Sequence, residues 1–69
     1  MWVMSQDESK IVQITEEVEV QTNTIQCRIN NHWTNIGTFK TEERAKEVLG
    51  RIFGAIQNGG FSYKMPREV

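Results

Sequence analysis

The clearest hydrophobic pattern in the chain lies between residues 40 and 60. Apolar side chains recur there every three or four residues, with charged side chains between them, at Ala45, Val48, Leu49, Ile52, Phe53 and Ile56. This spacing predicts one amphipathic helix over about residues 42–58. Thr41 supplies an N-cap hydroxyl, and Asn58-Gly59-Gly60 supplies a stop signal. The apolar face of this helix must cover the first forty residues.

Much of those forty residues alternates between apolar and polar side chains with the period of two that is typical of strands. Val18 and Val20 alternate with charged neighbours, and Ile25, Cys27 and Ile29 alternate with polar ones. The strands are expected over about 1–5, 10–14, 17–21, 25–30 and 33–39. The predicted fold class is α+β: an antiparallel meander of four to five short strands packed against one long helix, with a short final strand.

That final strand is expected over residues 61–65. Phe61, Tyr63 and Met65 fall on one side of an extended segment, and three large apolar groups need cover from water. The segment either returns to the sheet of its own chain or adds to the edge of another copy. These three residues are therefore the candidates for contacts in an oligomer.

Length and charge limit the partners. The 69 residues suffice for a single domain, residues 1–69, and a domain of this size buries only about 60% of its unfolded surface. Self-association would stabilise so thin a core, so we expect a homo-oligomer. Eight basic and nine acidic side chains leave a net charge of −1, which draws the chain neither to nucleic acid nor to an anionic membrane.

The single cysteine and the first residues of the chain indicate the cellular compartment in which the protein resides. Cys27 has no partner for an internal disulfide, and its place in an alternating strand predicts a buried thiol in a reducing environment. Ser5-Gln6-Asp7 follow the first apolar residues too soon for a signal peptide, and no run approaches the ~20 apolar residues of a membrane span. We expect a cytoplasmic protein.

Candidate catalytic groups are few. His32 is the one histidine of the sequence, and with Cys27 buried neither a Cys-His pair nor a zinc site can be assembled. Glu16 and Glu17 are neighbours in an extended segment, so their carboxylates point to opposite faces. We therefore predict no catalytic residue, no metal, no cofactor and no enzymatic activity.

Nucleotide binding is the alternative to protein binding. A site for a phosphorylated nucleotide needs N–H groups at a helix start, basic side chains and an aromatic plate; the candidates are Arg28, His32, Trp33, Lys40, Thr41 and Arg44. Glu42 and Glu43 place negative charge in the helix turn that would receive the phosphate. A cradle within one subunit is disfavoured, whereas one assembled between subunits stays open. A place at the rim or core of the sheet is the simpler role for Trp33.

Three segments carry a resemblance to a family of proteins. They are Met1-Trp2-Val3-Met4-Ser5-Gln6-Asp7, Ile36-Gly37-Thr38-Phe39-Lys40-Thr41-Glu42-Glu43-Arg44-Ala45-Lys46-Glu47-Val48-Leu49 and Tyr63-Lys64-Met65-Pro66. Together they resemble short proteins encoded by phages, prophages and genomes of Gram-positive bacteria, whose members begin Met-Trp-Ile-x-Ser-Gln-Asp-Gly. Glu8 stands where those members have the glycine. The resemblance implies a genomic setting and no particular active site.

Small phage proteins often bind and block a host factor or a signalling nucleotide, which is an analogy at the level of size and setting. We therefore expect a non-enzymatic binding or inhibitory module that acts through protein–protein contacts, with a host defence factor as its target. The alternative is an anti-defence sponge that sequesters a nucleotide second messenger between subunits.

Overall fold

The structure, a computed structural model, describes residues 1–68. Within them the elements follow in the order β1 (Trp2–Met4), β2 (Ile11–Gln13), β3 (Val18–Gln21), β4 (Thr24–Ile29), β5 (His32–Thr38), α1 (Glu42–Gln57) and β6 (Ser62–Lys64). The predicted α+β class is confirmed, with one helix in the C-terminal half of the described residues and a short strand after it.

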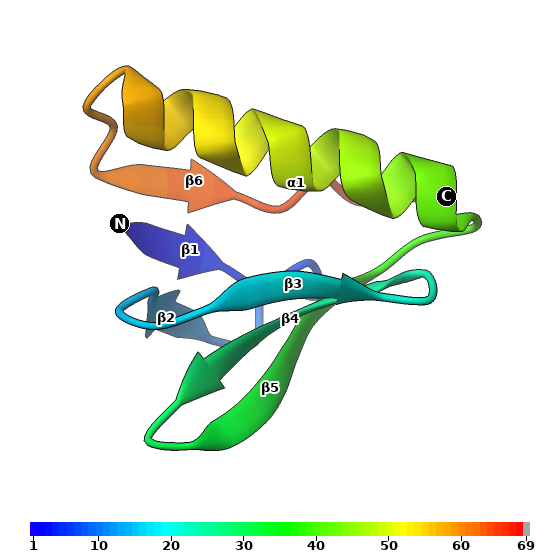
Figure 1. Ribbon diagram of the computed structural model, residues 1–69, viewed down its shortest axis with the longest axis horizontal. Helices are drawn as coiled ribbons and strands as arrows, with labels where there is room; N and C mark the ends of the chain where they lie inside the picture. The colour runs from blue at the N-terminus through cyan, green and yellow to red at the C-terminus, as the bar shows by residue number, and fades with distance from the viewer. Residues whose placement is uncertain (69) are drawn as a thin grey trace.

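The strands are divided between two three-stranded sheets. The first has the order β2-β1-β6, with β2 antiparallel and β6 parallel to β1. The second has the order β3-β4-β5 and is antiparallel throughout. Figure 1 shows α1 running across the top of the molecule, next to β6 and above β3. The predicted meander is thus interrupted between β2 and β3, which belong to different sheets.

The last strand returns to its own chain. Trp2 N donates to Phe61 O at 2.8 Å, and Met65 N donates to Met4 O at 3.1 Å, so β6 is fixed to β1 at both ends. Of the two placements considered for residues 61–65, the structure has the one within the subunit. The parallel pairing brings the beginning and the end of the chain side by side.

Left-handed backbone forms the tight turns. Asn30 and Asn31 join β4 to β5 with φ values of 51° and 66°, which asparagine adopts readily. Thr22, at the turn between β3 and β4, has a φ of 57°. A β-branched residue is strained at such an angle, because its side chain crowds the backbone.

Replacing Thr22 by glycine should therefore stabilise the protein. We expect a gain of about 1 kcal/mol, equivalent to a rise of roughly 4–8 °C in melting temperature for a domain of this size. Gly59→Ala is the opposite substitution, since Gly59 has a φ of 73° and open space around it. It should lower the melting temperature. Thermal unfolding by circular dichroism measures both, and a drop for Thr22→Gly would contradict the strain.

Both ends of the helix follow the sequence prediction. The Thr41 hydroxyl accepts a hydrogen bond from Arg44 N at 3.1 Å, as an N-cap does. At the other end, Gly60 N donates to Ala55 O at 2.8 Å and Gly59 N to Ile56 O at 3.0 Å. This pair of hydrogen bonds with a left-handed glycine is a Schellman motif, and it turns the chain back toward β6.

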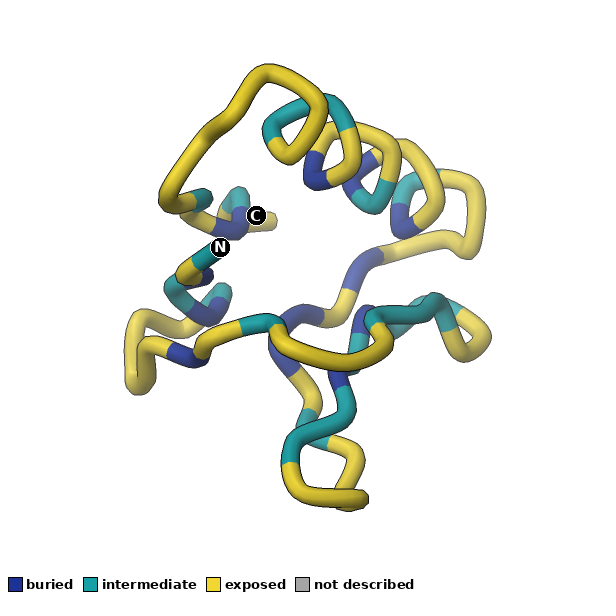
Figure 2. Tube along the Cα trace, turned by 60° about the vertical axis from the view of Figure 1, so that its left-hand side comes forward, coloured by how far each residue is buried: buried dark blue, intermediate teal, exposed yellow. Residues whose placement is uncertain are grey.

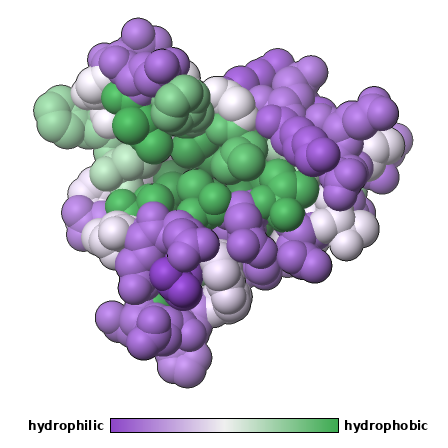
Figure 3. Space-filling model, viewed as in Figure 1, coloured by the Kyte–Doolittle hydropathy of each residue, from purple (hydrophilic) through white to green (hydrophobic). Residues whose placement is uncertain are grey.

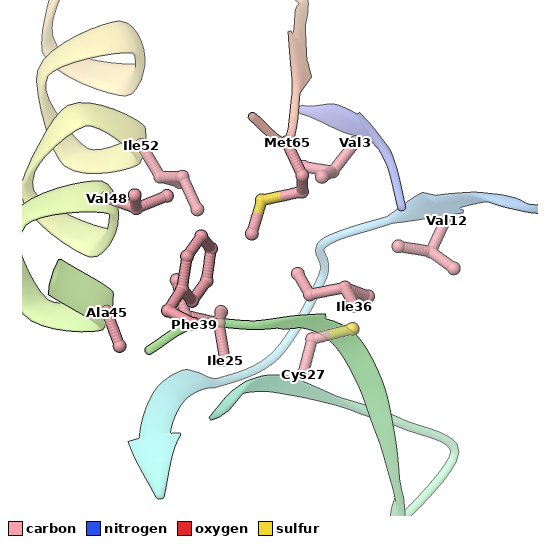
Figure 4. Close-up of a cluster of buried hydrophobic side chains, with 10 residues drawn as sticks. All are labelled: Val3, Val12, Ile25, Cys27, Ile36, Phe39, Ala45, Val48, Ile52 and Met65. Carbon is pink, nitrogen blue, oxygen red and sulfur yellow. The ribbon is translucent and has the colours of Figure 1, made fainter. Parts of the chain in front are cut away.

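The core lies where the helix and both sheets meet. Its buried residues are Val3, Val12, Ile25, Cys27, Ile36, Phe39, Ala45, Val48, Ile52 and Met65. In Figure 4 the ring of Phe39 lies between α1 and Met65, so that one side chain bridges the helix and the C-terminal segment. A Cβ at Gly37 would lie 2.9 Å from Met65 Cε, so a larger residue at this position of β5 would displace the end of the Met65 side chain.

Candidate functional site

The hairpin of β4 and β5 carries three of the predicted ligand-binding residues. Arg28 and Trp33 are cross-strand partners, and Arg28 Cζ lies 5.7 Å from the centroid of the Trp33 ring, within cation–π distance. Arg28 Nη2 also donates to Glu17 Oε1 at 2.7 Å. His32 is exposed beside Trp33. The tip of the hairpin projects from the body of the molecule (Figure 2), so Trp33 is a rim residue and this cluster faces solvent.

The other three candidates lie at the start of the helix. Lys40 and Thr41 are exposed, and the Thr41 hydroxyl is occupied by capping. Arg44 donates from Nε to Glu68 Oε1 at 2.7 Å and also pairs with Glu47. The hydrogen bond to Glu68 raises the pKa of Arg44, with a further contribution from Glu47. These acids already satisfy the guanidinium that an anion would need.

The two groups of candidates lie at opposite ends of β5. Trp33 is near its first residue and Lys40 follows its last, and the seven residues of this strand span roughly 20 Å. One subunit therefore does not bring the aromatic plate and the helix start together.

The three candidates for oligomer contacts have different environments. Met65 is completely buried in the core, Tyr63 is half-buried, and Phe61 is 87% exposed. Met65 contributes to the stability of its own chain and is not at the surface. Phe61 remains as the member of this set that is free to touch another molecule.

Sequence reasoning assigned no functional role to the loop between β1 and β2, which contains the Ser5-Gln6-Asp7 motif. Gln6 N donates to Ile36 O, and Thr38 N donates to Gln6 Oε1, both at 2.9 Å. Gln6 Nε2 donates to Pro66 O at 3.1 Å. One side chain thus joins the two sheets and the C-terminal segment, beside a polar hollow of about 310 Å³.

Asp7 organises the same loop. Its Oδ1 accepts hydrogen bonds from Ser9 Oγ at 2.7 Å, Ser5 Oγ at 2.8 Å and Ser9 N at 3.0 Å. These bonds, that from the Ser9 hydroxyl first, lower the pKa of Asp7 from 3.8 to about 2. Glu8 has a φ of 61°, so the turn has left-handed backbone at a residue other than glycine. The motif is accounted for by the architecture of the loop.

Lowering the pH should destabilise the protein because Asp7 becomes protonated. Its folded-state pKa is depressed, so its contribution to stability is present above pH 3.8 and is lost as the pH falls from 3.8 to about 2. We expect Asp7→Asn to be less stable than the wild type at pH 5 and to lose less stability between pH 5 and pH 2. Urea midpoints at the two pH values measure this. Glu16→Gln is the control, because Glu16 is exposed and makes no hydrogen bond or ion pair within residues 1–68; equal behaviour of the two variants would exclude this role for Asp7.

Two apolar surfaces remain open on the described residues. Trp2, Met4 and Ile11 line a hollow of about 430 Å³ on the outer face of the first sheet. A second hollow of about 270 Å³ lies between α1 and β3 and is lined by Val18, Leu49, Ile52, Phe53 and Ile56. Figure 3 shows hydrophobic residues gathered below the helix, with hydrophilic residues along most of their border. These surfaces were not predicted, because periodicity shows which residues share a face and not whether that face is covered.

No cluster of three or more His, Cys, Asp or Glu side chains with the geometry to hold a metal ion occurs within residues 1–68. Cys27 is buried, as predicted, and burial raises the pKa of its thiol. In the same residues no helix is long and apolar enough to cross a bilayer.

Neither a protein-family model, nor a curated protein, nor a solved structure matches this chain.

Proposed function

We propose that the chain is a non-enzymatic binding module of the phage or prophage type, which inhibits a host factor, such as a defence protein, through protein–protein contacts. The observation that supports this is the amount of large apolar surface left exposed: Trp2, Ile11, Trp33, Phe53, Ile56 and Phe61 are each between 42% and 87% exposed. Trp2 and Ile11 line one apolar hollow and Phe53 and Ile56 line another, and an exposed apolar patch of this kind is typical of a surface that binds another protein.

The experiment is a comparison of captured proteins. The tagged chain, Ile11→Ser and Phe53→Ser are each incubated with lysate of a Gram-positive bacterium, and retained proteins are identified by mass spectrometry. Both residues are about 60% exposed, so the variants should fold. We expect at least one protein that the wild type retains and one of the variants loses. Identical retention by all three chains would contradict the proposal.

Self-association is part of the same proposal. Light scattering gives the mass, and thermal unfolding at two protein concentrations shows whether assembly stabilises the fold, because an assembly melts higher when concentrated. A monomeric mass and a melting temperature independent of concentration would remove the homo-oligomer.

The alternative function is a sponge for a nucleotide second messenger bound between subunits. The stacked pair of Arg28 and Trp33 favours it, because a cation and an aromatic plate at a projecting tip are suited to a nucleobase. A thermal-shift screen with cyclic dinucleotides and mononucleotides tests it. A shift that Arg28→Ala and Trp33→Ala abolish would support the sponge, and no shift with any nucleotide would exclude it.

A further inference from the structure

The hollow between α1 and β3 has the form of a groove beside a sheet edge. Val18 lines it from β3, and Leu49, Phe53 and Ile56 line it from α1. Val20 lies on the same face of β3 as Val18 and packs against the core. Its volume of about 270 Å³ is smaller than a typical pocket for a small molecule. Side chains of an extended segment, entering one at a time, fit such a groove better than a compact ligand does.

The edge of β3 beside this groove has unpaired backbone groups. Arg28 N donates to Glu17 O at 2.8 Å. The backbone N–H and C=O groups of every second residue from Glu17, namely Glu19 and Gln21, therefore also point toward β4. Val18 and Val20 therefore direct their N–H and C=O groups away from β4. No strand among residues 1–68 pairs with that side of β3, and an unpaired strand edge is a template for another strand.

The charge at this edge indicates the kind of strand. Glu17 and Glu19 project from the outer face of β3, and Glu16 precedes them, which puts three acids within four residues. Arg28 is the one basic side chain within residues 1–68 that pairs with any of them. An added strand would place alternate side chains beside these carboxylates, where lysine or arginine is favoured, and the others in the apolar groove.

We propose that this edge and groove bind an extended segment of a partner protein in which apolar residues alternate with lysine or arginine. The inference rests on the proposed function, because it names the surface and the partner chemistry that the module uses. A second copy of the chain does not fit as well. Pairing β3 with β3 across a two-fold axis brings Glu17 and Glu19 next to the same carboxylates of the other copy, and like charges opposite each other are destabilising.

The test uses the full chain and capped seven-residue peptides of alternating lysine and valine. In an antiparallel addition the valines lie directly opposite Val18 and Val20, so the valine N–H groups donate to β3 and the lysine N–H groups point away. Three peptides are compared: unmodified, N-methylated at the valines, and N-methylated at the lysines. All three have the same charge and the same side chains.

We expect the unmodified peptide to bind and to slow amide hydrogen exchange of Val18 and Val20 at least tenfold at saturation, as measured by NMR. Methylation of the valines should abolish both effects, and methylation of the lysines should preserve them. The reverse pattern would mean parallel addition to the same edge. Equal binding of the two methylated peptides, no binding of any peptide, or unchanged exchange at Val18 and Val20 would overturn the proposal.

Variants of the protein locate the site. Phe53→Ala and Glu19→Gln should each weaken binding of the unmodified peptide by about tenfold. Phe61→Ala is the control, because Phe61 is more exposed than Phe53 and does not line the groove; it should leave the affinity unchanged. Equal losses in Phe53→Ala and Phe61→Ala would show general hydrophobic adhesion in place of this groove.

The failure of this inference and that of the proposed function give different results. If a captured host protein is displaced by the unmodified peptide and lost in Phe53→Ala, the host protein occupies the groove. If it is retained by Phe53→Ala and resists the peptide, the groove proposal fails while the binding function stands. If the wild type captures no protein that any variant loses, the proposed function fails, and the peptide titration still decides whether the edge accepts a basic strand.

Discussion

Replacing Ile52 by alanine should lower the free energy of unfolding by about 2–5 kcal/mol and leave much of the protein unfolded at 25 °C. Ile52 is 1% exposed, and its side chain lies at the centre of the contact between the helix and the sheets (Figure 4). The substitution removes the transfer free energy of the side chain and leaves a cavity in a tightly packed core. A domain of this size has little stability in reserve.

Urea unfolding followed by circular dichroism measures the effect. Phe53→Ala is the matched control, since Phe53 is the next residue, is larger, and is 59% exposed. Its free energy of unfolding should change by less than about 1 kcal/mol. If the two substitutions cost the same, the helix would have a different face turned to the core.

This comparison also refines the face that the sequence predicts. The apolar pattern, which also contains Phe53 and Ile56, predicts that Leu49 and Ile52 lie at the centre of the stripe. In the structure, Ala45, Val48 and Ile52 form the buried line, while Leu49 is partly buried and Phe53 and Ile56 are exposed on the flank toward β3. The apolar stripe of α1 is wider than the sheet surface that it covers, so one side of the stripe stays exposed. That exposed side lines the groove beside β3.

Most of the features that the sequence predicts correctly depend on residues that are close together in the chain. The cap at Thr41 and the stop at Gly59 are each specified within a few residues, and the structure confirms them. The alternation around Cys27 correctly placed its thiol inside. The partner of β6 could not be predicted in this way. Its pairing with β1 joins residues sixty apart, and a period of two identifies a strand without identifying its neighbour.

The candidate site was predicted less well for a related reason. The types of residue that suit an anion were identified, but distance along a strand separates Trp33 from Lys40, and Arg44 is satisfied by Glu68, which is 24 residues away in sequence. Trp2 and Ile11 belong to two apolar segments, residues 1–5 and 10–14, that each predict a strand. Nothing in that pattern indicates that one face of the strand stays open.

Met65→Ala should be nearly as damaging as Ile52→Ala, with a loss of about 2–5 kcal/mol. Met65 is completely buried, and its terminal methyl lies so close to Gly37 that a Cβ there would be 2.9 Å away. Its backbone N–H donates to Met4 O, so the same residue also holds the end of β6 against β1. Truncating the side chain therefore weakens the contact between the C-terminal segment and both sheets.

Phe61→Ala is the control from the same segment. Phe61 is 87% exposed, so its loss should change the free energy of unfolding by at most about 0.5 kcal/mol in a dilute sample. Thermal unfolding of both variants at two protein concentrations separates two roles of this segment. If Met65→Ala lowers the melting temperature equally at both concentrations, Met65 contributes within one chain. If Phe61→Ala lowers the melting temperature more at the higher concentration, Phe61 lies in a contact between copies. A larger loss for Phe61→Ala than for Met65→Ala at low concentration would contradict the internal position of β6.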